Sequence, residues 1–246
     1  MKKIMLLVLC MLLSAVFLSG CVVLDFSPGS FNGIRGSGTP ETYTYNVGDF
    51  TEINIELLCD IEYYSAPSET VTLEIQPNLH EYVVVEESGG VLTVSSSRNI
   101  LWSIKAPVLT VSIPVLNKLY IAGAGDFTAH DTINADRLSI CLDGAGNIYA
   151  DLDVDALFVS MNGAGRYELS GRADSADFVL DGAGTINALP LQTRDATVNL
   201  AGVGTVKVSC SNNLRITADG VGRVEYKGSP HVDLNTDGIV SVHKVS

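Results

Sequence analysis

The sequence predicts an all-β protein, a right-handed parallel β-helix (solenoid) with coils of about 20 residues and a strand-rich N-terminal part. Three observations predict it. A Gly-x-Gly triplet recurs six times between residues 123 and 222, with steps of 21, 19, 19, 20 and 18 residues between first glycines. Apolar and polar residues alternate on both sides of every triplet. No stretch with helical periodicity follows any triplet.

The triplets are best interpreted as the corners of successive coils. Their glycines are Gly123 and Gly125, Gly144 and Gly146, Gly163 and Gly165, Gly182 and Gly184, Gly202 and Gly204, and Gly220 and Gly222. A phosphate-binding loop would occur once, ahead of a helix, so we expect no nucleotide and no other cofactor. Glycine suits a bend where a Cβ would clash or φ is positive. The Ala or Val between the two glycines is expected to point inward.

The residues beside the corners predict two inward faces in each coil. Two residues before the first glycine stand Leu142, Met161, Leu180, Leu200 and Ala218, and two residues after the second stand Phe127, Ile148, Tyr167, Ile186, Val206 and Val224. Stacked coils would pair each strand with its equivalent about 4.8 Å away. A degenerate seventh corner, Asp237-Gly238-Ile239, leads us to expect an irregular last coil.

Residues 41–118 lack the triplet but are also rich in predicted strands. In FTEINIEL, Ile53, Ile55 and Leu57 alternate inward. Further strands are predicted at 71–75, 82–87, 91–96 and 108–113, with a hairpin at Ser88-Gly89-Gly90. We expect this part to cap or begin the solenoid, and residues 119–246 to form the coils with Gly-x-Gly corners. The whole of 41–246 is then a single domain.

The first twenty residues are typical of a secretory signal. Lys2 and Lys3 precede an apolar run over 4–17 that is too short to span a bilayer comfortably. The tetrapeptide Leu18-Ser19-Gly20-Cys21 resembles the lipobox of bacterial lipoproteins. This resemblance implies cleavage after Gly20 and acylation of Cys21, with palmitate among the acyl chains. An ordinary signal peptide or an N-terminal anchor helix is the alternative. The lipidated cysteine and a flexible tether would occupy residues 21–40.

Charge restricts the partners of the protein. Removal of Lys2 and Lys3 leaves 13 of the 15 basic residues against 28 acidic ones, a net charge of −15. An acidic chain argues against nucleic acid, because phosphate contacts need a basic face. The negative charge also argues against docking on anionic headgroups. The acyl chains on Cys21 would therefore attach the protein to the membrane. Cys59, Cys141 and Cys210 are an odd number, so we expect small packing residues and not a disulfide framework.

Two features could carry chemistry. Aspartates precede several corners at Asp143, Asp181 and Asp219, which could form a weak calcium site or a catalytic pair. Asx-type turn hydrogen bonds to the following amides explain the same residues, and we expect that role and no metal. Trp102 lies on a loop over 98–107 and is the candidate ligand contact. Its alternative role is to cap the end of the solenoid. We expect no catalytic residue, since no nucleophile or histidine motif stands out.

The chain resembles the bacterial head GIN domain family of auto-transporter adhesins over residues 47–243. The resemblance is carried by FTEINIELLCDIEYY, by VLTVSIPVLNKLYIAGAGDF, by the GAG and GVG corners, and by VEYKGSPHV at 224–232. It implies an extracytoplasmic β-helical protein with no established catalytic residues.

Together these observations predict a lipid-anchored protein of the cell envelope that acts by binding or adhesion. Its ligand would be a glycan or a protein. Its location would be the cell surface, the outer membrane or the periplasmic face. Two alternatives remain: a carbohydrate-active β-helix enzyme (a lyase or hydrolase), and a structural envelope protein without its own ligand.

Overall fold

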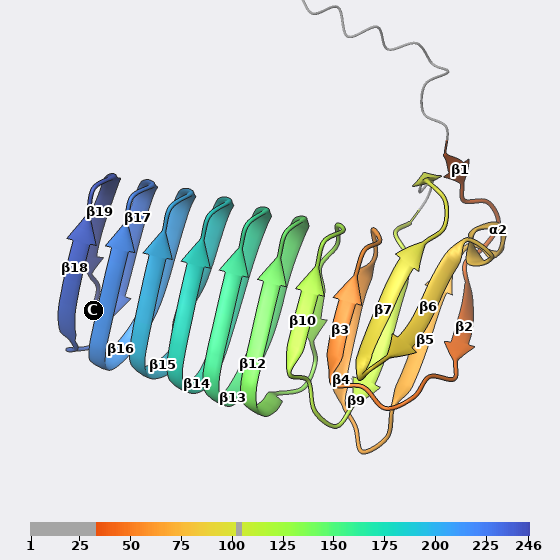
Figure 1. The fold of residues 1–246 in the computed structure, drawn as a ribbon, viewed down its shortest axis with the longest axis horizontal. Helices are drawn as coiled ribbons and strands as arrows, with labels where there is room; N and C mark the ends of the chain where they lie inside the picture. The colour runs from red at the N-terminus through yellow and green to blue at the C-terminus, as the bar shows by residue number, and fades with distance from the viewer. Residues whose placement is uncertain (1–32, 102–104) are drawn as a thin grey trace, which may run out of the picture. The chain divides into compact units, whose positions relative to one another are not determined.

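The structure is a computed structural model that describes residues 33–101 and 105–246. Residues 34–246 form one compact unit. This unit is a right-handed parallel β-solenoid of about seven turns, each about 19 residues long (Figure 1). The predicted fold class is therefore confirmed. The expected cleavage site at Gly20, the expected acylation site at Cys21 and the candidate ligand contact Trp102 lie outside the described residues.

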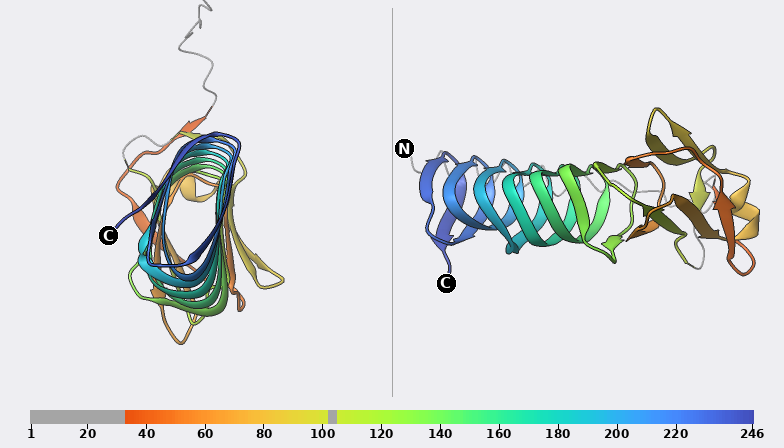
Figure 2. Two further views of the ribbon diagram at one scale, coloured as in Figure 1. Left: turned by 90° about the vertical axis from the view of Figure 1, so that its left-hand side faces the viewer. Right: turned by 90° about the horizontal axis from the view of Figure 1, so that it is seen from below.

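In the regular coils, long strands continue from one corner around the opposite bend to the next corner: β13 (Ala145–Met161), β14 (Ala164–Leu180), β15 (Ala183–Leu200) and β16 (Val203–Ala218). Shorter strands build the coils at either end: β12 (Ile133–Leu142), β17 (Val221–Lys227), β18 (His231–Thr236) and β19 (Ile239–Lys244). Each pairs in parallel with its equivalent in the next coil, for example Ile148 with Tyr167. Seen end-on, the coils superimpose on one oval outline (Figure 2).

The N-terminal part both begins the solenoid and caps it. Its main strands are β2 (Glu41–Tyr45), β3 (Glu52–Ile55), β4 (Asp60–Ser65), β5 (Thr70–Ile75), β6 (Val83–Ser88), β7 (Val91–Ser96), β9 (Val108–Ile113), β10 (Lys118–Ile121) and β11 (Phe127–Ala129). The predicted hairpin joins β6 to β7, and Gly89 and Gly90 both have positive φ. Three antiparallel pairs close this end of the sheet: β2 with β5, β5 with β9, and β6 with β7.

The order of the first coils in space differs from their order in the chain. Strands β3 and β4 form a coil that is covered on one side by β7 and β9 and on the other by β10 and β11. The chain therefore leaves this coil, builds the cap and then returns to the opposite side. Three short elements accompany the cap: β1 (Ile34–Arg35), β8 (Ile100–Leu101) and α2 (Pro77–His80). Strand β1 pairs with β8 and lies within the segment expected to be a tether.

Side chains from both inner faces fill the core. The predicted inward columns are buried, including Phe127, Tyr167 and Ile186 at 0% exposure. Among the described cysteines, Cys59 and Cys210 are buried, Cys141 is half-buried and none forms a disulfide. Burial, with the nearby Asp60 charge, raises the pKa of the Cys59 thiol to about 12. This cysteine is therefore a neutral packing residue at physiological pH.

The corner glycines are required by the close approach of stacked coils. A Cβ built on Gly144 would lie 1.6 Å from the carbonyl oxygen of Gly123, and one on Gly163 would lie 1.8 Å from that of Gly144. The residue between the glycines does not point inward as expected. Ala145 and Ala164 are exposed, and Val203 is 58% exposed. Alternation explains this result, because successive residues point to opposite sides of the chain. The two glycines lie against the neighbouring coil, so the residue between them points to solvent.

The last coil is regular, which corrects the expectation drawn from the degenerate seventh corner. The Ile239 amide donates to the Gly220 carbonyl at 2.9 Å, as the equivalent residues do at earlier corners. Strand β18 pairs in register with β16, and β19 with β17. Gly238 keeps the first glycine of the corner, where a Cβ would lie 2.3 Å from the Gly220 carbonyl oxygen, and Val240 takes the place of the second glycine.

We expect Gly163→Ala to lower the free energy of unfolding by at least about 2 kcal/mol, because the new methyl overlaps the Gly144 carbonyl oxygen. The matched control is Ala164→Val, which recreates the valine of the corner at Val203 and should be nearly neutral. Urea unfolding of both variants measures the difference. Equal stability of the two variants would contradict the steric explanation.

Candidate functional site

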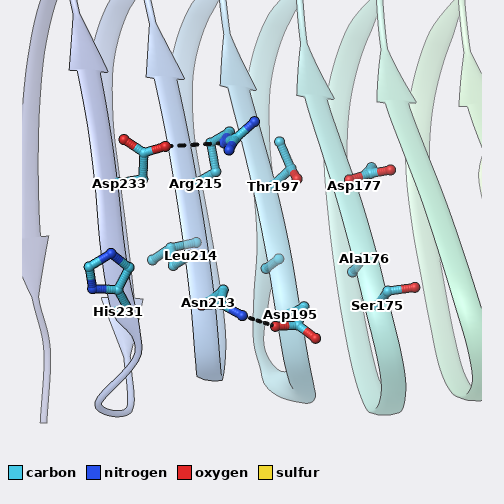
Figure 3. A pocket seen from close by; sticks show the side chains of 11 residues that line it. Ser175, Ala176, Asp177, Asp195, Thr197, Asn213, Leu214, Arg215, His231 and Asp233 are labelled. Carbon is cyan, nitrogen blue, oxygen red and sulfur yellow. Dashed lines mark hydrogen bonds and ion pairs between the residues drawn. The ribbon is translucent and has the colours of Figure 1, made fainter.

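A polar hollow lies on the outward face of β14, β15, β16 and β18 (Figure 3). Two rows of side chains line it, and each row contributes one residue per coil. The lower row in the figure contains Ser175, Asp195, Asn213 and His231, and the upper row contains Asp177, Thr197, Arg215 and Asp233. The parallel register places equivalent residues side by side, so the rows run along the axis of the solenoid.

Inward-pointing residues between the two rows, two of them alanines, form the floor of the hollow. Ala176 and Ala196 lie beneath the rows and are buried at 3% and 5% exposure, beside the buried Leu214. Ser175 and Thr197 are also short and leave open space above this floor. The resulting hollow has a volume of about 500 Å³. This volume is in the range of small-molecule sites, although the hollow lies on an open sheet face.

Hydrogen bonds fix one carboxylate in the hollow. The Nδ2 atoms of Asn213 and Asn212 each donate to Asp195 Oδ1 at 2.7 Å, and Arg194 Nε donates to its Oδ2 at 2.9 Å. These hydrogen bonds lower the pKa of Asp195 below the usual aspartate value. Asp195 is therefore a fixed, ionised acceptor. Arg215 Nε forms an ion pair with Asp233 Oδ2 at 3.2 Å.

An exposed aromatic ring lies at one end of the hollow. Phe158 pairs with Asp177 of the next coil, so it continues the upper row by one position. Its exposure is 41%, whereas the neighbouring Leu157 and Val159 point inward and are buried. The site therefore combines an apolar ring with carboxylate, amide, hydroxyl and guanidinium groups.

A second polar region lies on the other face of the coils, over β14 to β17. Its charged residues are Arg166, Glu168, Lys207, Arg223 and Glu225. They pair with one another: Arg166 with Glu168 at 3.3 Å, and Glu225 with Lys207 at 3.0 Å and Arg223 at 3.2 Å. Hydrogen bonds from Lys207 and Arg223 lower the pKa of Glu225. This region is about 270 Å³ in volume, and its three positive and two negative side chains leave a local charge of +1.

The aspartates that precede the corners, Asp143, Asp181 and Asp219, are exposed. Asp143 links neighbouring coils and does not form the expected turn. Asp143 accepts hydrogen bonds from Tyr120 Oη and from Asn162 Nδ2 of the neighbouring coils. The Asx-turn assignment is wrong at Asp143, because the amides of Gly144 and Ala145 donate to carbonyls of the preceding coil. In the part of the chain that the structure describes, no group of three or more His, Cys, Asp or Glu residues could hold a metal ion.

Sequence reasoning did not find the hollow, although one of its signals was available. Phe158 is three residues before the predicted inward residue Met161, so alternation places its ring outside. The role of Asp195 had no local signal, because two of its donors come from the following coil. Within residues 33–101 and 105–246, no helix has the length and hydropathy needed to span a bilayer.

These features define a class: a β-solenoid protein that presents polar rows on a rigid face. The family model described as "putative auto-transporter adhesin, head GIN domain" matches residues 49–230. The chain belongs to this family, and membership supports a role in binding or adhesion at an extracellular or surface location. A comparison with curated proteins found no match.

Solved structures share the fold over most of the chain. A "putative adhesin" from Bacteroides fragilis aligns with a TM-score of 0.82 and 25% identity, covering 87% of this chain and 100% of the other. A "putative lipid binding protein" from Parabacteroides distasonis aligns with a TM-score of 0.72 and 25% identity, covering 87% and 99%. A "putative adhesin" from Parabacteroides merdae has a TM-score of 0.67 and 23% identity over 87% and 99%, which shows the fold alone.

The hydrogen bonds of Asp195 predict a pH-dependent contribution to stability. A carboxyl group whose pKa is lowered by folding stabilises the folded state above its unfolded pKa of about 3.9. That contribution is lost as the pH falls through the lower folded pKa. Asp195→Ala should therefore destabilise the protein at pH 7, and the difference from wild type should shrink below pH 3. Urea midpoints at both pH values measure it. A difference that stays constant with pH would contradict this role.

Proposed function

We propose that the protein is a lipid-anchored binding or adhesion protein of the cell envelope. The observation that carries the proposal is a lipobox-like Leu18-Ser19-Gly20-Cys21 ahead of a solenoid of an adhesin family. In this proposal residues 1–20 are a signal peptide and Cys21 bears the lipid. The tether expected over 22–40 is shortened to 22–33, because β1 (Ile34–Arg35) pairs with β8 and belongs to the folded unit. The domain of residues 34–246 then meets the partner outside the cytoplasm.

Lipid is the suitable anchor for a chain of this charge. The full sequence has a net charge of −13, which opposes adsorption to anionic headgroups. Each buried acyl methylene contributes about 0.8 kcal/mol, so two or three chains on Cys21 hold a protein firmly. The polar surface of the solenoid is then free to face a partner.

The rigidity of the solenoid favours binding over chemistry. Backbone ladders run through every coil, so a partner that contacts the outward rows orders little additional chain. Among the described residues, the carboxyl groups of Asp195 and Glu225 have lowered pKa values and are held ionised by their donors. A general acid would need the opposite shift. Both properties support a binding surface as the working part of the molecule.

Replacement of the proposed lipid site tests the anchor. Cys21→Ala should abolish incorporation of labelled palmitate and move the protein from the membrane fraction to the soluble or precursor fraction. Cys10→Ala is the matched control, because it removes a cysteine of the signal and leaves the lipobox intact. Labelling of Cys21→Ala at the wild-type level would refute the anchor.

The binding role is tested on cells. A bacterial strain that expresses the full chain should adhere to mucin-coated and fibronectin-coated surfaces at least severalfold more than a strain that lacks it. Purified full chain added in solution should compete with this adherence. Adherence that does not change with expression on either surface would count against the adhesion role. Shortening of a polysaccharide by the purified chain would favour the enzyme instead.

A further inference from the structure

We propose that the hollow of Figure 3, extended by Phe158, binds an extended uncharged glycan chain that lies along the solenoid axis. This inference rests on the proposed function and deepens it, because it names the binding face and the chemical class of the ligand. The observations that carry it are the geometry of the two rows, their hydrogen-bonding capacity, the exposed phenyl ring and the local charge.

The geometry of the rows suits a polymer. Each row presents one side chain per coil, at a spacing of about 4.8 Å, and the hollow extends over β14, β15, β16 and β18. This spacing is comparable with the length of one sugar in an extended chain. Successive sugars could therefore meet equivalent positions on successive coils, so that one kind of contact is repeated along the ligand.

The hydrogen-bonding groups of the hollow are available to a ligand. Within the described residues, the side chains of Asp177, Thr197 and His231 make no hydrogen bond or ion pair with protein groups. Sugar hydroxyls both donate and accept, so they match a carboxylate, a hydroxyl and an imidazole together. Asp195 adds an acceptor whose position is already fixed by three donors, which reduces the entropy lost on binding.

Phe158 supplies the apolar contact that recognition of a sugar ring needs. It has no polar atom to satisfy at the surface, yet 41% of its area is exposed directly beside Asp177. A sugar ring has apolar C–H groups on its faces, and the phenyl ring can bury them. An aromatic anchor next to hydrogen-bonding groups is typical of the positions that dominate binding energy.

Charge selects an uncharged glycan. The hollow holds Asp177, Asp195 and Asp233, and the guanidinium groups of Arg194 and Arg215 are paired with the last two. Three negative charges and two positive ones leave a local charge of −1, in a chain whose net charge is −13. An acidic polysaccharide would meet like charge both locally and over the whole surface.

Binding of defined oligosaccharides to the purified full chain tests the proposal. The probes are cellohexaose, mannohexaose and chitohexaose, with hexagalacturonate as the acidic comparison, and the measurement is isothermal titration calorimetry. At least one neutral hexasaccharide should bind, and hexagalacturonate should bind more weakly. Phe158→Ala should weaken that binding at least tenfold. Thr197→Arg, which fills the middle of the hollow, should abolish it.

The matched control is Tyr149→Ala. Tyr149 is also on β13, is 40% exposed and lies outside the hollow, so its loss should change the affinity less than twofold. Thermal unfolding verifies that each variant is folded. Should Phe158→Ala fail to fold, Asp177→Asn takes its place, because this side chain has no partner in the described protein, and it should weaken binding severalfold.

Three outcomes would overturn the inference: no neutral hexasaccharide binds, hexagalacturonate binds most tightly, or Tyr149→Ala weakens binding as much as Phe158→Ala. Expression-dependent adherence that persists in any of these cases leaves the proposed function standing and removes only the glycan site. Loss of adherence itself removes the proposed function.

Discussion

The structure depends on the close stacking of its corners. At each Gly-x-Gly corner one carbonyl of the neighbouring coil accepts two consecutive amides; that of Leu142, for example, accepts those of Asn162 at 2.9 Å and Gly163 at 3.0 Å. This arrangement leaves no room for a Cβ and fixes each coil against the previous one without slippage. Since a shift of one residue would turn the buried columns outward, the corners determine the register of the strand segments beside them. The register changes only away from the corners, as in the shift between Glu168 and Gly171 of β14.

That register also creates the outward surface. Residues separated by one coil become neighbours, so a polar side chain can be positioned by a residue about 19 places away, as Asp195 is by Asn213. The corners and the core therefore act as a scaffold that is the same in every coil. The outward residues of each coil are not constrained by the packing of the corners and the core. Binding properties can thus vary along the rows while the fold stays constant.

Much of the fold follows from local pattern, and the failures have physical causes. Phe127 and Ile148 are predictable as core because their alternation is fixed by the adjacent corner. The inward position assigned to the middle residue of the corner was wrong, because the glycines themselves face the neighbouring coil. Placement of the β3–β4 coil between β7–β9 and β10–β11 has no local signal, since residues 41–118 carry no corner triplet. The floor of the hollow includes Ala176 and Ala196, which become neighbours only when their coils stack.

The start of the folded unit and the hollow lie far apart along the solenoid. This separation is suitable for a protein that binds a partner at a surface. The unit begins at β1 beside the cap, whereas the hollow lies on β14, β15, β16 and β18, toward the other end of the solenoid (Figure 1). The intervening coils are rigid, because each is hydrogen-bonded to the next along its length. The proposed tether, joined to the first strand, would therefore leave the hollow several coils away from the point of attachment. The same stacking that fixes the core thus determines how far the outward rows stand from the start of the domain.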